Sequence, residues 1–144
     1  LDGGEGNDLR RGAHGADVLR GGAGDDLLVY NAADTVIDGE LGYDILRLDP
    51  GINLNLTAGT QIRNIERIDL GSGDAAHNIT LTVDGVLAAT DGDRELTITG
   101  DFNDSVTMTG AVFQAQTLID GHAYNQYSFG TTTILVEDGV MVAA

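Results

Sequence analysis

Residues 3–29 read GGEGNDLRR (3–11), GAHGADVLR (12–20) and GGAGDDLLV (21–29), three consecutive units of nine residues in one register. The next unit, YNAADTVID (30–38), has lost the pattern, and GELGYDILR (39–47) regains it in the same frame. Glycine recurs at unit positions one and four, and aspartate recurs at position six. Chance does not hold three columns in register, so these residues form a repeat array.

Each column has a physical reason. Glycine at positions one and four permits left-handed backbone angles, which are expected to curl a six-residue turn so that its carbonyls face one point. The aspartate at position six adds a carboxylate there. Position eight carries Leu19, Leu28 and Leu46, each in a short extended segment with its side chain inward. One unit cannot bury a single apolar side chain, so the units are expected to stack.

If consecutive units lie on opposite sides of a flattened coil, units 18 residues apart stack directly. Asp8 then lies above Asp26, and Asp26 above Asp44. Each pair, with several carbonyls, would give a cage of about six oxygen ligands. Such a cage suits Ca²⁺, with ligands at about 2.3–2.6 Å, better than Mg²⁺, which retains its waters.

The composition narrows the possible partners. The 144 residues carry a net charge of −16, no Lys and no Cys, and 18 of the 23 acidic residues are Asp. This charge argues against binding a nucleic-acid backbone or an anionic lipid surface. No apolar run approaches the roughly 20 residues that cross a bilayer, so no membrane insertion is expected. A divalent cation would relieve the self-repulsion.

The nonapeptides resemble the repeats-in-toxin (RTX) family, whose consensus is GGxGxDxUx. The resemblance implies a parallel β-roll that binds extracellular Ca²⁺ and is exported by a type I secretion system. It implies that the position-six carboxylates bind the metal, and these are Asp8, Asp17, Asp26 and Asp44. It also implies carbonyl ligands around the glycine turns, namely Gly3, Gly4 and Gly6; Gly12, Ala13 and Gly15; Gly21, Gly22 and Gly24; and Gly39, Glu40 and Gly42.

The array departs from this consensus at several positions. Arg10 occupies the apolar position eight of the first unit, and Thr35 stands where the Tyr30 unit should have Asp. Asp34 or Asp38 is the candidate replacement. We therefore expect two good sites along Asp8, Asp26 and Asp44, and one or two weaker sites opposite. Because Leu1 and Asp2 fit positions eight and nine of a preceding unit, we expect the chain to be the C-terminal piece of a longer protein.

The repeat ends at the turn Asp49-Pro50-Gly51, which divides the chain into a β-roll (1–49) and a β-rich C-terminal cap (50–144). The overall class is therefore all-β. In the cap, Ile62, Ile65, Ile68 and Leu70 are expected inward. Residues 83–89 are expected to form one short helix capped by Asp84. Asp120-Gly121 and Asp138-Gly139 each suggest a hairpin turn.

The second half also resembles the C-terminal region of giant bacterial RTX adhesins, through NIERIDL (64–70), ITLTVDGVLAAT (79–90), LTITGDFNDSVTMTG (96–110) and TTTILVEDGVMVAA (131–144). Those proteins end in a target domain for type I secretion. The resemblance implies a calcium-binding module of a secreted surface or biofilm adhesin, with its export signal near the last residues. As an isolated module the chain is expected to be a monomer.

No catalytic motif is found, so we do not expect an enzyme. His14, His77 and His122 are far apart in sequence, and His14 is expected on the surface. There is no GxSxG and no phosphate-binding loop. Acid pairs such as Asp91 and Asp93 fit turns better than a glycosidase. Two alternatives stay open: the calcium-binding secretion domain of an RTX toxin or enzyme (a protease, lipase or epimerase), and a module that itself binds sugar or ice.

Overall fold

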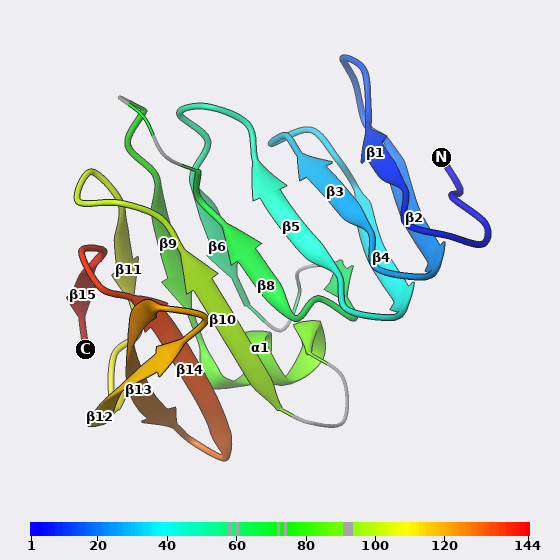
Figure 1. Cartoon of the computed structure of the whole chain (residues 1–144). Coiled ribbons are helices and arrows are strands. Elements are labelled where there is room, and N and C mark those ends of the chain that lie inside the picture. The colour runs from blue at the N-terminus through cyan, green and yellow to red at the C-terminus, as the bar shows by residue number, and fades with distance from the viewer. Residues whose placement is uncertain (58, 60, 72, 74, 91–93) are drawn as a thin grey trace.

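The computed structural model describes residues 1–57, 59, 61–71, 73, 75–90 and 94–144, which form strands β1–β15 and helix α1. The chain is mostly β, which confirms the all-β class, and most of its strand pairs are parallel. Figure 1 shows one long sheet crossing the molecule, with shorter strands forming a second layer behind it.

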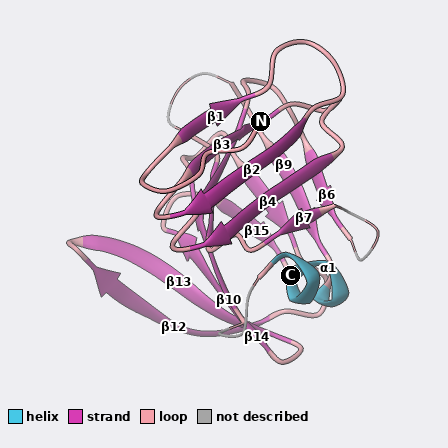
Figure 2. Ribbon diagram, turned by 90° about the vertical axis from the view of Figure 1, so that its right-hand side faces the viewer, coloured by secondary structure: helices cyan, strands magenta, loops and turns pink. Residues whose placement is uncertain are grey.

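The long sheet has eight strands, and its spatial order follows the chain until the C-terminal hairpin. The order is β1 (Leu9–Arg11), β3 (Leu27–Tyr30), β5 (Ile45–Leu48), β8 (Arg67–Asp69), β10 (Glu95–Thr99), β14 (Thr132–Glu137), β13 (His122–Phe129) and β12 (Val112–Ile119). The pairs from β1 to β14 are parallel, and β12, β13 and β14 are antiparallel. The β12–β13 hairpin projects from the body (Figure 2).

Two smaller parallel sheets form the second layer. One contains β2 (Val18–Ala23), β4 (Val36–Leu41) and β7 (Ile62–Arg63), and the other contains β6 (Leu54–Leu56), β9 (Asn78–Leu81), β11 (Ser105–Thr107) and β15 (Met141–Ala143). Helix α1 (Val83–Ala89) has seven residues. No helix among the described residues is long and apolar enough to cross a membrane.

The predicted register is confirmed in the array. Leu9 pairs with Leu27 and Leu27 with Ile45, while Val18 pairs with Val36 on the other side. Position eight is buried: Leu19, Leu28 and Leu46 are fully buried, and the degenerate unit keeps Ile37 there at 1% exposure. Apolar burial therefore survives in the unit that has lost its glycines.

The long sheet continues past Pro50. Strand β5 pairs with β8 on the far side of that turn, and β4 pairs with β7. Ile62, Ile65, Ile68 and Leu70 are buried as predicted, in the same core as the array leucines. The division into 1–49 and 50–144 describes where the sequence pattern stops, while strands on both sides share one sheet and one core.

Two local predictions for the second half need correction. Helix α1 has the predicted bounds, but its cap is Thr82, whose Oγ1 accepts the Gly85 N–H at 3.0 Å, because the helix begins at Val83 and Asp84 lies in its first turn. The Asp120-Gly121 hairpin is confirmed. The Asp138-Gly139 hairpin is wrong, since β14 and β15 on either side of this turn join different sheets.

Candidate metal centre

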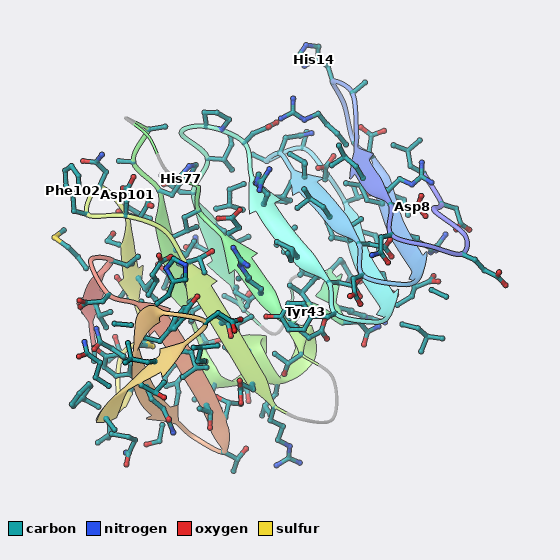
Figure 3. The ribbon with its side chains drawn as sticks, viewed as in Figure 1. Asp8, His14, Tyr43, His77, Asp101 and Phe102 are labelled. Atoms are coloured by element: carbon teal, nitrogen blue, oxygen red, sulfur yellow. The ribbon has the colours of Figure 1, made fainter. Side chains whose placement is uncertain are left out.

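The position-six aspartates stand in two rows of turns. Asp8, Asp26 and Asp44 directly precede β1, β3 and β5 of the long sheet, so parallel pairing of these strands stacks the three turns. Asp17 precedes β2 and lies in the turn at the opposite edge. Figure 3 labels Asp8 at the start of β1 and His14 at the tip of the loop that follows it. The sequence therefore assigned the aspartates to the correct rows.

A chain of hydrogen bonds holds the Asp8 row together. The N–H of Asp8 donates to Oδ1 of Asp26 at 2.7 Å, and the N–H of Asp26 donates to Oδ1 of Asp44 at 2.9 Å. The N–H of Asp44 donates to Oε2 of Glu66 at 2.6 Å. The carboxylates of Asp26 and Asp44 thus each have one oxygen fixed by the backbone of the preceding turn, which orients the second oxygen.

That second oxygen has no partner. The Oδ2 atoms of Asp8, Asp17, Asp26 and Asp44 are buried and form no hydrogen bond. Asp44 is fully buried and Asp26 is 2% exposed. An unpartnered buried oxygen costs about 1–3 kcal/mol, and more when it is charged. Four aspartates at the same position of their turns therefore each keep one buried oxygen without a hydrogen bond.

The glycines at position one leave room for these oxygens. A methyl group on Gly3 would overlap Oδ2 of Asp8 and the carbonyl oxygen of Gly21. A methyl group on Gly21 would likewise overlap Oδ2 of Asp26 and the carbonyl oxygen of Gly39. Each turn of the row therefore brings a carboxylate oxygen beside a carbonyl oxygen of the next turn. Such hard donors suit a hard divalent cation.

The prediction of left-handed angles at position one was wrong. Positive φ occurs at positions two and four, in Gly4, Gly6, Gly15, Gly22, Gly24 and Gly42, and also in Glu40 at 70°. Position one is glycine because a side chain there would fill the space beside the aspartate. The carbonyls of Gly4, Gly6 and Gly24 instead abut glycines of the next turn, and the Gly4 carbonyl accepts the Ala23 N–H at 2.7 Å.

The opposite row differs from the Asp8 row, and the weaker sites expected there stay a prediction. A methyl group on Gly12 would have only Asp17 atoms as its three nearest neighbours, whereas at Gly3 and Gly21 a carbonyl oxygen of the next turn is among the three. Asp34 accepts two hydrogen bonds from Asn31, through the backbone N–H at 2.9 Å and the side-chain amide at 3.1 Å. Asp38 accepts the side-chain amide of Asn64 at 2.8 Å. Asp34 and Asp38, the candidate replacements for the missing aspartate, are thus engaged in local hydrogen bonds. Ala13, the residue that replaces a glycine in the second unit, is exposed.

Arg10 affects the first turn of the Asp8 row. Its guanidinium lies 3.5 Å from Oδ1 of Asp8 and donates to the carbonyl oxygen of Gly3 at 3.2 Å. A positive charge beside these donors weakens cation binding at this turn.

Asp44, at the other end of the row, is surrounded by negative charges instead. Burial, together with the charges of Asp26, Asp25 and Asp38, raises its pKa to about 6, against the single hydrogen bond from the Asp26 backbone that lowers it.

Sequence reasoning missed Asn64 and Glu66. Both lie beyond the nonapeptides, and Glu66 stands 22 residues after Asp44 instead of 18, so no periodicity marks it. The described residues contain no group of three or more His, Cys, Asp or Glu side chains that could hold a metal. Any ion in this row therefore depends on backbone carbonyls together with single carboxylates.

The histidines do not converge on a site. His14 and His122 are exposed, as expected for His14, while His77 is buried and its Nδ1 lies 2.8 Å from the carbonyl oxygen of Ile52. Asp91 and Asp93 lie outside the described residues. No protein-family model, no curated protein and no solved structure matches the chain.

Proposed function

We propose that residues 1–49 are a calcium-binding parallel β-roll of the RTX type, in the C-terminal module of a secreted bacterial surface adhesin. The observation that carries the proposal is the set of buried, unpartnered aspartate oxygens beside glycine carbonyls in stacked turns. The calcium, the secretion machinery and the extracellular location are parts of this proposal, with the module acting as a monomer.

The donor atoms favour calcium for a chemical reason. They are carboxylate and carbonyl oxygens held by backbone hydrogen bonds, and thiolate is absent from the chain. A bound Ca²⁺ would supply two positive charges and accept six to eight oxygen ligands, as hard-cation sites do. The chain itself contributes the prearranged turns, because Oδ1 of Asp26 and of Asp44 is already fixed by a neighbouring N–H while Oδ2 is left available.

The same features explain a calcium-dependent fold. A chain with a net charge of −16 and 21 glycines faces strong self-repulsion and a large loss of conformational entropy on folding. In a cytosol poor in calcium, the array would stay unfolded and could pass through a secretion channel. Outside, millimolar calcium would fill sites with dissociation constants of about 10⁻⁴–10⁻³ M. Binding to the folded state alone then stabilises it by mass action.

The test combines calorimetry with circular dichroism of the full chain in calcium and in excess chelator. We expect saturable calcium binding and a gain of β signal on adding calcium, with little response to Mg²⁺. The matched variants are Asp26→Asn, which removes one buried carboxylate of the row, and Asp138→Asn, which removes one exposed charge far from it. Asp26→Asn should lose an ion and Asp138→Asn should not. Wild-type protein that binds no calcium would refute the proposal.

A further inference from the structure

The hydrogen-bonded row of acids extends one step beyond the nonapeptides. Glu66 accepts the Asp44 N–H at 2.6 Å, as Asp44 accepts the N–H of Asp26. Glu66 is 8% exposed and directly precedes β8, which is the position that Asp44 holds before β5. It therefore takes the structural place of a position-six aspartate, although its segment lacks the glycine pattern.

Asn64 takes the place of the next glycine turn. A methyl group on Gly39 would overlap Oδ2 of Asp44 and the carbonyl oxygen of Asn64. This is the arrangement found at Gly3 and Gly21, with an asparagine carbonyl in place of a glycine carbonyl. Asn64 has φ of 53°, a left-handed angle that Asn tolerates better than most residues. Its side-chain amide donates to Asp38, which fixes the orientation of the peptide.

Asp44 lacks the compensation that a buried carboxylate normally receives. It is fully buried, its Oδ2 has no hydrogen bond, and no ion pair reaches it within the described part of the chain. Asp69, on the neighbouring strand, is also buried, but the Arg47 guanidinium lies 2.9 Å from it. A buried carboxylate without a positive partner is strongly unfavourable. At Asp44 the missing partner is a cation.

We propose that a further calcium ion binds between the turn 39–44 and the segment Asn64–Glu66, with Oδ2 of Asp44 and the Asn64 carbonyl as ligands. Glu66 is a positioning residue: it holds the Asp44 backbone and adds negative charge. This inference rests on the proposed calcium function but assigns a site outside the nonapeptides. Because the two segments lead into β5 and β8, the ion would fasten the array to the second half of the chain.

The experiment counts calcium ions on the full chain by native mass spectrometry and measures their affinities by calorimetry, with calcium alone as the probe. Glu66→Gln keeps an oxygen that can accept the Asp44 N–H but removes the charge. We expect it to weaken one ion by about 10-fold or more and leave the others unchanged, as loss of a supporting group typically does. Asp138→Asn, the matched control for charge, should bind every ion as the wild type does.

A second readout separates a metal site from a purely structural role. Glu66 N–H and Arg67 N–H both donate to the Asp44 carbonyl, at 3.1 and 3.2 Å. In wild-type protein, calcium should slow hydrogen exchange at these two amides, and in Glu66→Gln the calcium response should disappear there while persisting in β1 and β3. If Glu66→Gln fails to fold, Gly39→Ala replaces it, because its methyl group would fill the space between Oδ2 of Asp44 and the Asn64 carbonyl and should remove one ion.

The outcomes distinguish this site from the general function. If Asp26→Asn loses an ion while Glu66→Gln binds the full set with wild-type affinity, the Asn64–Glu66 site is overturned and the array function stands. If the wild type binds no calcium, both proposals fall together. Selective loss of one ion in Glu66→Gln, with an unchanged control, supports the site.

Discussion

Asp26 in the array and Asp104 in the second half are both buried carboxylates with similar surroundings. Asp26 is 2% exposed and Asp104 1%. The Oδ1 of each accepts a backbone N–H from a distant segment, that of Asp8 for Asp26 and that of His77 for Asp104 at 3.0 Å. Each also has its Oδ2 beside a glycine that could not carry a side chain, Gly21 or Gly100.

The difference between them is one hydrogen bond. Oδ2 of Asp104 accepts the Asp101 N–H at 2.9 Å, from within its own turn, whereas Oδ2 of Asp26 has no partner. The turn GDFND (100–104) is one residue shorter between glycine and aspartate than GGAGDD (21–26). The shorter turn satisfies its own carboxylate, and the longer one leaves an oxygen for a ligand. Burial alone therefore does not distinguish the two aspartates, and the unpartnered oxygen of Asp26 does.

The largest effect should come from removing calcium. We expect excess chelator to abolish slow hydrogen exchange in β1 to β4, while β10, β11 and β14 around Asp104 retain theirs. Each filled site contributes about 2.7 kcal/mol when free calcium exceeds the dissociation constant 100-fold. Hydrogen exchange followed by mass spectrometry, with and without calcium, measures this. Equal protection of both regions in chelator would contradict the difference proposed between the array and the second half.

A methyl group at Gly21 should have the next largest effect. Gly21→Ala forces a carbon against Oδ2 of Asp26 and the Gly39 carbonyl, so it should cost about 3 kcal/mol through overpacking and abolish one ion. Gly59→Ala is the control, because a methyl group there meets nothing within 4 Å and its φ is not left-handed. It should change stability by less than about 0.5 kcal/mol. Urea unfolding in calcium measures both, and equal costs would contradict the steric account.

Asparagine substitutions should separate the two aspartates by their calcium dependence. Asp26→Asn should destabilise the protein by about 2 kcal/mol in calcium, through loss of one ion, and should have no effect in chelator, where the array is unfolded. Asp104→Asn loses the acceptor for the Asp101 N–H and should cost about 1–3 kcal/mol in both conditions. Unfolding curves of the two variants, each with and without calcium, check this, and a calcium-dependent cost at Asp104 would erase the distinction.

The part of the site that repeats could be predicted, and the part that does not repeat could not. Asp8, Asp26 and Asp44 stack because a fixed period of 18 residues places them before paired strands, and the same period buries Leu19, Leu28 and Leu46. Glu66 continues the row after an interval of 22 residues. Because this interval occurs once and differs from the period, the sequence does not mark Glu66 as part of the row.

The role of the position-one glycines was also beyond sequence reasoning. The repeat pattern shows that position 21 must be glycine. A left-handed backbone angle and a lack of space beside a carboxylate both select glycine, so the sequence does not tell which is the cause. Only the positions of Oδ2 of Asp26 and the Gly39 carbonyl show that space is the reason. For Arg10, likewise, the sequence showed only that it occupies an apolar position, while the contact with Asp8 and the Gly3 carbonyl depends on how the side chain folds back.

The smallest effect concerns pH. Burial raises the pKa of Asp44 from its usual value of 3.8 to about 6, so the folded apo protein binds more protons than the unfolded chain between these values. The stability that this group contributes is fully present below about pH 4 and is lost as the pH rises through about 6. In chelator, where the array is unfolded at pH 7, lowering the pH to 5 should therefore increase the β signal in circular dichroism. In calcium the sign should reverse, and the melting temperature should fall by a few degrees, on the order of the shift that 1 kcal/mol produces, because protons compete with the cation for the same oxygen. Asp44→Asn should flatten both trends, and a β signal in chelator that decreases as the pH is lowered would show that Asp44 is not the group responsible.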